Sequence, residues 1–372
     1  MLFRSQEQFR AIVARFLRDR APVSAVRAQM ASERGHDPGL WRALAQELGV
    51  TGVHVPEHCG GQGFGLEELC IAQEELGRAL TCAPFFASAV LATSALLELA
   101  DDDAQARLLP ALVAGERIAT LCWMEDSGDW RAEHCALTAT GDGDDVRLDG
   151  HKTFVLDGLA ADLLLVVARA PGAAGLGLYA VDGDATGLAR RGLATIDTTR
   201  RQAALTFTGC AARRLDTRSD FDAGFARVMD RATIALAAEM IGGAHALLDA
   251  AVEYAKLRMQ FGRPIGAFQA VKHKLAEMLL EVELATAAVR YAAAAGDSGD
   301  AETPALASLA KAMASDAYMR TAVEAVQIHG GIGFTWDNDT HLWFKRARSS
   351  TVLLGDAALH RERYIALTEA AA

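Results

Sequence analysis

The stretch that decides the fold is Arg258-Met259-Gln260-Phe261-Gly262-Arg263-Pro264-Ile265-Gly266-Ala267-Phe268-Gln269-Ala270-Val271-Lys272. An unbroken helical pattern from Ile234 to Phe261 leads into it, which places Arg258 at a helix end. An arginine there is either an ordinary C-terminal helix cation or a ligand for a phosphate, whose geometry the guanidinium fork matches. The residues that follow decide between these two interpretations.

Outward from this stretch, the pattern changes twice along the chain. Residues 1–117 and 221–372 have helical periodicity, whereas residues 118–220 contain short β-type runs separated by Gly and Asp. The β-type runs are Asp145–Leu148, Thr153–Leu156, Leu163–Ala168, Gly177–Val181 and Ala203–Thr208. The sequence therefore predicts an α+β chain with an N-terminal helical domain, a middle antiparallel β-domain and a C-terminal helical domain.

A second informative segment is Gln327-Ile328-His329-Gly330-Gly331-Ile332-Gly333-Phe334. It follows a helical pattern that begins with Thr303 as N-cap and Pro304 as the first helical residue. Glycines directly after a helix either simply end it or let backbone N–H groups approach a bound phosphate closely.

Together these two segments resemble the FAD-binding segments of the acyl-CoA dehydrogenase family, which read Arg-x-x-Phe-Gly, Pro-Ile, Phe-Gln and Gln-x-x-Gly-Gly-x-Gly. The resemblance covers nearly the whole chain and implies that family's fold, with a four-helix bundle in the C-terminal domain. It also implies an FAD cofactor, held in part by the neighbouring subunit. The residues implied for FAD are Arg258 at the pyrophosphate, Gln260 and Phe261 at the adenosine, Gln269 at the ribityl–phosphate region, and Gln327, Gly330 and Gly331 at the tail.

The side of the site that would face the flavin ring departs from the family pattern. Phe154 keeps the aromatic residue of the motif Gly-x-Lys-x-(Trp/Phe), but Leu156 stands where the family has a flavin-contacting Thr. Met124 likewise replaces a Thr in the segment 121–129, which is also shortened. Each flavin heteroatom left without a partner would weaken binding by roughly 1–3 kcal/mol unless backbone donors compensate.

The general base that the family's reaction requires is missing from both of its usual positions. Dehydrogenation removes an α-proton while a hydride leaves the β-carbon, and the usual Glu corresponds to Leu354 or, in some members, to Ala232. Glu239 and Asp356 are nearby carboxylates that could substitute for it. Alternatively, Glu239 is a structural carboxylate that pairs with an Arg, and Asp356 is the N-cap of a helix.

A base-lacking chain resembles one subunit of the α₂β₂ heterotetramers in this family, notably those of bacterial sterol side-chain degradation. The resemblance implies an acyl-CoA substrate, a homologous partner subunit that carries the catalytic Glu, and an electron-transfer flavoprotein as electron acceptor. Two alternatives stay open: a self-sufficient homotetramer with an unusual base, and a structural subunit that holds FAD without turnover.

Composition limits the other classes of function. The 372 residues carry a net charge of −11, which disfavours nucleic-acid binding. The six Cys show no zinc spacing, so no metal is predicted. The first residues lack an apolar signal core, and no apolar run of about 18 residues is evident. A cytoplasmic protein without a membrane partner is therefore expected.

Overall fold

The computed structural model describes residues 4–129, 131–141, 145–170, 175–216 and 220–371. Contacts between Cα atoms divide the chain into two compact units. The helical unit consists of Met1–Ala28, Leu66–Thr81 and Thr233–Ala372, and the sheet unit consists of Gln29–Gly65 and Cys82–Ala232. The N-terminal helices are thus shared between the two units, whereas the sequence predicts three consecutive domains. The boundaries at residues 117 and 220 stay a prediction.

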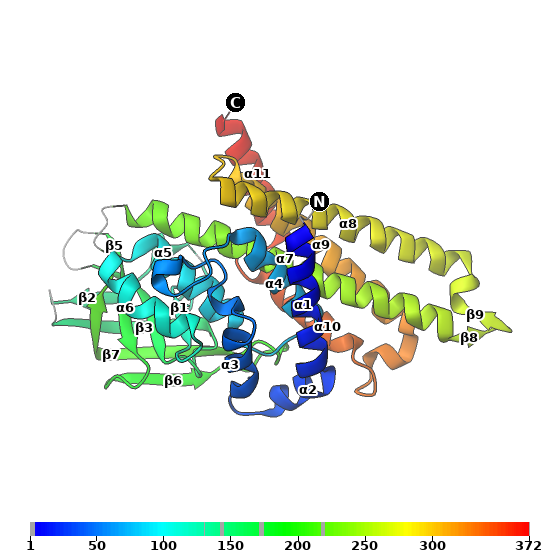
Figure 1. Ribbon diagram of the computed structural model, residues 1–372, viewed down its shortest axis with the longest axis horizontal. Helices are drawn as coiled ribbons and strands as arrows, with labels where there is room; N and C mark the ends of the chain where they lie inside the picture. The colour runs from blue at the N-terminus through cyan, green and yellow to red at the C-terminus, as the bar shows by residue number, and fades with distance from the viewer. Residues whose placement is uncertain (1–3, 130, 142–144, 171–174, 217–219, 372) are drawn as a thin grey trace. The chain divides into compact units, whose positions relative to one another are not determined.

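The helical unit is built around long helices. Its elements are α1 (Arg4–Arg20), most of α2 (Val23–Ala31), α4 (Leu66–Arg78), most of α7 (Phe221–Leu257), α8 (Gln269–Ser298), α9 (Thr303–His329), η6 (Gly330–Phe334), α10 (Thr340–Val352) and α11 (Ala357–Ala371). Helix α9 packs against α8, α10 and α11, so it forms the centre of the bundle. Figure 1 shows α7 and α8 running side by side toward the two short strands β8 (Met259–Gln260) and β9 (Arg263–Pro264).

Helices α4 and α7 approach each other at the level of their backbones. A Cβ added at Gly77 would overlap the carbonyl of Glu239, and one added at Gly242 would overlap the carbonyl of Glu74. Only glycine leaves room for two helix backbones to come this close. The Gly242-Gly243 pair inside α7 therefore has a packing role.

The sheet unit contains a seven-stranded sheet and short helices. Its strands are β1 (Ala119–Cys122), β2 (Thr138–Thr140), β3 (Val146–Leu156), β4 (Leu163–Arg169), β5 (Leu176–Asp182), β6 (Leu188–Gly192) and β7 (Gln202–Arg214). The pairing order is β1-β4-β2-β3-β7-β5, with β6 on β7 and a further pairing of β4 with β5. Strand β5 thus pairs with both β4 and β7, which curls the sheet back on itself and leaves fewer open edges.

The other elements of this unit are helical. They are α3 (Pro38–Gln46), η1 (Val50–Gly52), η2 (Glu57–Cys59), the π-helical η3 (Phe86–Ala92), α5 (Thr93–Leu99), α6 (Asp102–Val113) and η4 (Ala132–His134).

The predicted order of helical, β and helical segments is confirmed, with three corrections. The sheet is not purely antiparallel, because β1 pairs with β4 in parallel, a direction that apolar runs do not encode. Helix α7 ends at Leu257, four residues before the predicted Phe261, because the chain turns back into the hairpin. Helix α9 has Glu302 as its N-cap and includes Thr303.

Helix α7 is long and apolar enough to cross a membrane, judged by length and composition alone. Its apolar window has a mean hydropathy of 1.3, and 78% of that window is buried inside the protein. Burial of this extent is what a core helix shows, so the finding is weak support for a membrane span.

Candidate functional site

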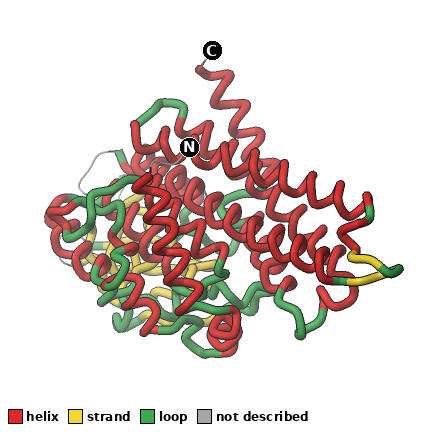
Figure 2. Tube along the Cα trace, turned by 45° about the vertical axis from the view of Figure 1, so that its right-hand side comes forward, coloured by secondary structure: helices red, strands yellow, loops and turns green. Residues whose placement is uncertain are grey.

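The predicted phosphate-binding arm is an exposed hairpin. Strands β8 and β9 pair in antiparallel register, and the turn between them has positive φ angles of 51° at Phe261 and 75° at Gly262. Two consecutive positive φ angles are typical of the two-residue turns that fit the twist of a hairpin. Figure 2 shows the hairpin in yellow, projecting beyond the ends of α7 and α8.

Apolar side chains of the arm face solvent in this chain. Phe261 is 91% exposed, Leu257 77% and Met259 53%. The arm is ordered by local contacts instead, because Phe268 meets Phe261 edge to face and lies under the Arg263 guanidinium, 4.2 Å from the ring centroid. An ordered but uncovered apolar hairpin is typical of a surface that a ligand or another chain covers.

The two predicted cofactor segments lie next to each other in the helical unit. The Tyr254 ring, on the last turns of α7, stacks on the His329 ring at the end of α9 with centroids 4.4 Å apart. The amide of Arg258 donates to the carbonyl of Tyr254, and Gly330 follows His329 directly. The contact therefore brings the start of the arm close to the glycine segment.

This arrangement fits a dinucleotide phosphate. The Arg258 guanidinium has no acceptor among the described residues, and a Cβ at Gly330 or Gly331 would meet nothing within 4 Å. A charged donor and open backbone are what a phosphate requires. The predicted side chains of Gln260, Gln269 and Gln327 are all exposed and so accessible to a ligand.

Met124 and Phe154, predicted to face the flavin ring, are neighbours in the sheet unit. The amide of Thr153 donates to the carbonyl of Met124 at 2.9 Å. The register of β3 against β7 shifts between Lys152 and Val155, and Phe154 has a φ of 54° within this bulge. A bulge redirects a side chain, and Phe154 is 38% exposed, whereas Leu156 is 1% exposed. Leu156 therefore has no hydroxyl group that could bond a ligand, and its side chain is almost inaccessible.

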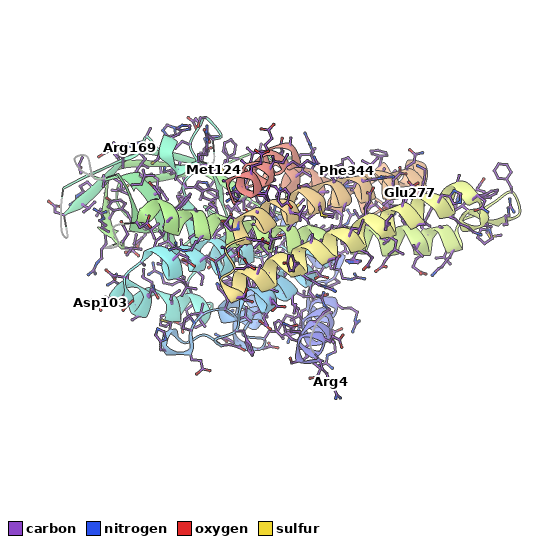
Figure 3. All side chains as sticks on the ribbon, turned by 90° about the horizontal axis from the view of Figure 1, so that it is seen from above. Arg4, Asp103, Met124, Arg169, Glu277 and Phe344 are labelled. Atoms are coloured by element: carbon purple, nitrogen blue, oxygen red, sulfur yellow. The ribbon has the colours of Figure 1, made fainter. Side chains whose placement is uncertain are left out.

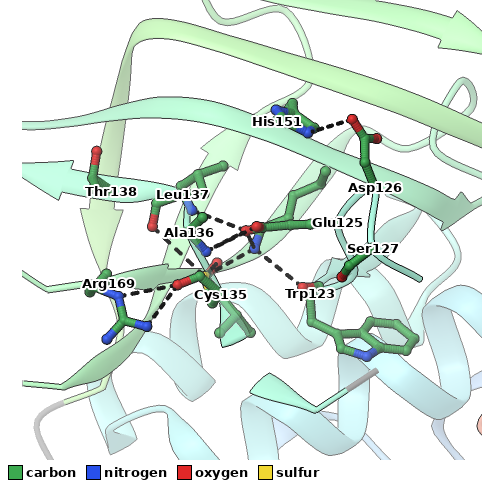
Figure 4. Close-up of polar contacts among 12 residues, drawn as sticks. Trp123, Glu125, Asp126, Ser127, Cys135, Ala136, Leu137, Thr138, His151 and Arg169 are labelled. Carbon is green, nitrogen blue, oxygen red and sulfur yellow. Dashed lines mark hydrogen bonds and ion pairs between the residues drawn. The ribbon is translucent and has the colours of Figure 1, made fainter. Parts of the chain in front are cut away.

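The structure adds a buried ionic cluster that the sequence did not reveal (Figure 4). Lys152, with a fully buried side chain, donates to Glu125 at 2.8 Å, to the carbonyl of Trp123 at 3.2 Å and to the Cys135 thiol at 3.2 Å. Glu125 also accepts from the amides of Ala136 and Leu137. Burial raises the pKa of Glu125, but Lys152 and these amides outweigh it, so that the pKa is lowered overall.

This cluster fixes the backbone beside Met124. The only sequence signal for it is the position of Lys152 in the Gly-x-Lys pattern and of Glu125 directly after Met124. Burial raises the pKa of the Cys135 thiol, which keeps it protonated.

The two positions at which the resemblance predicts the base hold buried apolar side chains. Leu354 is 3% exposed and Ala232 is completely buried. Leu354 also has a φ of 60°, a left-handed conformation that is strained for a bulky residue. Neither position can accept a proton through its side chain.

Glu239 lies on α7 with both carboxylate oxygens engaged. Arg346 of α10 donates to Oε1 at 3.0 Å, and Gln73 of α4 donates to Oε2 at 2.9 Å. The Glu239 and Arg346 side chains are only 6% and 5% exposed. These contacts favour the structural interpretation of Glu239 over the role of a base.

Asp356 caps a helix. Its Oδ1 accepts from the amide of Leu359 at 2.9 Å, in the first turn of α11, and the residue is exposed. This is the geometry of an N-cap. Asp356 is therefore engaged as a helix cap at the surface, which favours the structural interpretation over the role of a base.

A helical bundle with an exposed hairpin, in one chain with a β-sheet unit, is the arrangement that the resemblance to acyl-CoA dehydrogenases predicts. Models of the N-terminal and the C-terminal domain of acyl-CoA dehydrogenases match residues 4–116 and 223–366. The chain belongs to the acyl-CoA dehydrogenase family, whose members are oxidoreductases acting on CH–CH bonds.

Individual relatives agree with this assignment. The acyl-CoA dehydrogenase IpdE2 of Mycobacterium tuberculosis is 37% identical over 94% of this chain and 92% of its own length. A solved steroid acyl-CoA dehydrogenase, a variant of Tcur3481-Tcur3483, has a TM-score of 0.88 at 33% identity, covering 99% of this chain and 98% of that one. The ChsE4-ChsE5 complex of Mycobacterium tuberculosis has a TM-score of 0.87 at 28% identity, covering 98% and 96%.

Proposed function

We propose that this chain is an FAD-dependent acyl-CoA dehydrogenase-like subunit that acts in α,β-desaturation together with a homologous subunit carrying the base. The observation that carries the proposal is the loss of every carboxylate from the base positions. Leu354 and Ala232 are apolar and buried, and the alternative carboxylate Glu239 accepts hydrogen bonds from Arg346 and Gln73. Because general-base catalysis contributes roughly 10²–10⁴-fold, the chain alone would turn over very slowly.

The relatives support a heteromeric assembly and a sterol-derived substrate. Two of the similar solved structures are named as two-component proteins, and one of them is named as a steroid acyl-CoA dehydrogenase. The proposed substrate is accordingly the CoA thioester of a sterol side chain.

Within this function the chain contributes cofactor binding. Arg258 would neutralise the FAD pyrophosphate of an adjacent subunit, with Gln260, Phe261 and Gln269 along the arm. FAD, when bound, supplies the acceptor for the hydride that leaves the β-carbon. Leu354 cannot accept the α-proton, so the base of the homologous subunit would remove it.

The outer surface of α8 is the proposed subunit contact. Leu280 is 60% exposed, Leu284 52% and Tyr291 58%, and their spacing places all three on one face of the helix. Figure 3 shows side chains projecting along this helix, with Glu277 labelled. Most apolar residues of α7 and α9, by contrast, are buried within the chain itself. Contacts across α8 would build the proposed dimer of dimers.

Separate and joint expression tests the proposal. The purified chain should oxidise acyl-CoA negligibly with a ferrocenium acceptor, and the complex with its partner should be yellow and active. The physiological acceptor proposed is an electron-transfer flavoprotein, which should be reduced by the complex in the presence of substrate. Robust turnover by the isolated chain would support the self-sufficient homotetramer instead. A yellow complex without turnover on any acyl-CoA would support the structural subunit.

A further inference from the structure

The sheet unit contains a cavity that none of the predicted FAD residues lines. Its volume is about 690 Å³, and its lining comes from α3, from the loop before α3, and from the loops before β1 and before β4. All of these segments belong to the one compact unit of Gln29–Gly65 and Cys82–Ala232. A cavity of this size is typical of a site for a small molecule.

Arginine side chains fix two walls of this cavity. Arg190 donates to the carbonyls of Gly158 and Ala161, both at 2.9 Å, and so holds the loop before β4. Arg201 donates to the carbonyl of Ser32 at 2.9 Å, in the loop before α3. Because guanidinium groups bind these loops through their backbones, the cavity has a fixed shape before any ligand enters.

A buried indole donor in the cavity lacks a partner. Trp41 is 3% exposed, and its Nε1 has no hydrogen-bond acceptor among the described residues. A Cβ added at Gly115, which also lines the cavity, would lie 3.6 Å from this atom, so glycine keeps the space beside the N–H open. Buried polar atoms in folded proteins are nearly always hydrogen-bonded. An acceptor from outside the chain is therefore expected beside Trp41.

His36 supplies an acceptor in the same cavity. Its Nδ1 lies 3.3 Å from the carbonyl oxygen of Arg34, and because a carbonyl only accepts, Nδ1 carries the proton of the neutral ring. Burial is the largest cause that lowers the pKa of His36, and the Arg34 charge lowers it further. The ring is therefore neutral at physiological pH, and its Nε2 is left as an acceptor with no donor in the described parts of the chain.

The cavity is lined by charges of both signs. Arg34 and Arg42 are exposed, and neither guanidinium pairs with a carboxylate among the residues that the structure describes. The carboxylates of three further residues line the same cavity, namely Glu33, Glu116 and Asp162. A ligand with a single charge would meet like charges here, whereas a ligand that carries a cation and an anion matches both sets.

We propose that this cavity binds a free amino acid with an apolar side chain. The ammonium group donates to His36 Nε2 and to the acidic side chains, and the carboxylate accepts from Arg34 and from the Trp41 N–H. The apolar side chain lies against Ile118 and Leu159, which also line the cavity. This is a ligand site in addition to the proposed dehydrogenase function, with which it shares no residue.

Calorimetry on the purified full chain tests the proposal with three ligands that share one aromatic ring. L-phenylalanine carries both charges, 3-phenylpropanoate lacks the ammonium group, and 2-phenylethylamine lacks the carboxylate. The variants are Trp41→Phe, which removes the N–H and keeps an aromatic ring, and Arg34→Gln, which removes the charge. The matched controls are Trp336→Phe and Arg15→Gln, at exposed residues outside the cavity.

We expect L-phenylalanine to bind at least about tenfold more tightly than either analogue, because each analogue lacks one charged group. Trp41→Phe should raise the dissociation constant of L-phenylalanine about fivefold, the effect of one hydrogen bond, and Arg34→Gln about tenfold. Arg34→Gln should change the binding of 2-phenylethylamine less than about twofold, since that ligand has no carboxylate. The two controls should change no dissociation constant.

Three results would overturn the proposal. No saturable binding of L-phenylalanine at millimolar concentration would exclude this ligand class, and equal binding of the three ligands would exclude a site for a zwitterion. Unchanged binding in both Trp41→Phe and Arg34→Gln would place the ligand elsewhere. If Trp41→Phe fails to fold, Arg34→Gln decides alone, because its side chain is exposed. None of these measurements uses acyl-CoA turnover, so failure here is distinguishable from failure of the proposed dehydrogenase function.

Discussion

Removing the carboxylate of Glu239 should destabilise the protein far more than it slows catalysis. The side chains of Glu239 and Arg346 are 6% and 5% exposed, and their Oε1 and Nη1 atoms are 3.0 Å apart. Glu239→Leu would leave the Arg346 guanidinium buried without this counter-charge and would free the amide of Gln73. Breaking a buried ion pair from one side costs about 3–5 kcal/mol.

Thermal unfolding of the purified chain measures this cost. At about 2 °C per kcal/mol for a chain of this length, the midpoint should fall by roughly 6–10 °C. The double variant Glu239→Leu/Arg346→Met should regain most of the loss, because an apolar pair of similar volume removes the buried charge as well. Turnover is measured at a temperature at which the variant is still folded. The complex that contains the variant should then turn over within a few-fold of the rate of the unmodified complex.

The opposite pattern would refute this reasoning. If Glu239→Leu kept its unfolding midpoint but lost turnover by two orders of magnitude or more, Glu239 would be the base and the ion pair with Arg346 would be incidental. A double variant no more stable than Glu239→Leu alone would show that the pair is not what the carboxylate stabilises.

Four further predictions concern the site, the surface and the pH dependence of stability. Arg258→Ala should weaken FAD binding by about 2–4 kcal/mol, since it removes a charged donor to a phosphate; unchanged flavin content of the purified complex would contradict the arm assignment. Leu354→Glu should raise acyl-CoA oxidation by the isolated chain with a ferrocenium acceptor, and no gain at all would speak against Leu354 as the base position. Leu280→Glu with Leu284→Glu should reduce the mass of the assembly in light scattering, whereas an unchanged mass would move the contact away from α8. Burial, and then the Arg231 charge, lower the pKa of His54 from 6.5 to about 3, so only the unfolded chain takes up this proton between these two values. The free energy of unfolding therefore decreases as pH falls through this range, by up to about 1.4 kcal/mol per pH unit. Measured by urea unfolding, it should decrease less steeply with falling pH in His54→Leu than in the unmodified chain. Equal slopes in the two proteins would refute the lowered pKa of His54.

Much of this protein could be predicted from local patterns. The spacing of the residues after Arg258, and of the glycines after His329, identified the family, because these motifs consist of residues close together in the sequence. The apolar residue types of Leu354 and Ala232 are also given by the sequence, and the absence of a base in this chain stays a prediction. Helix ends with clear signals, such as Gly330 after α9, were placed correctly.

The tertiary structure alone decided which partners the polar residues have. Glu239 meets Arg346 across 107 positions and Lys152 meets Glu125 across 27, distances over which sequence patterns carry no information about pairing. The same holds for Arg201, whose bond to Ser32 spans 169 positions. The sequence thus determined the family, and it predicts the cofactor arm and the missing base, because each depends on residue type and local spacing. Packing determined which carboxylate is structural, which face of α8 is left open and how the walls of the cavity beside Trp41 are held, because these depend on segments that meet only in the folded chain.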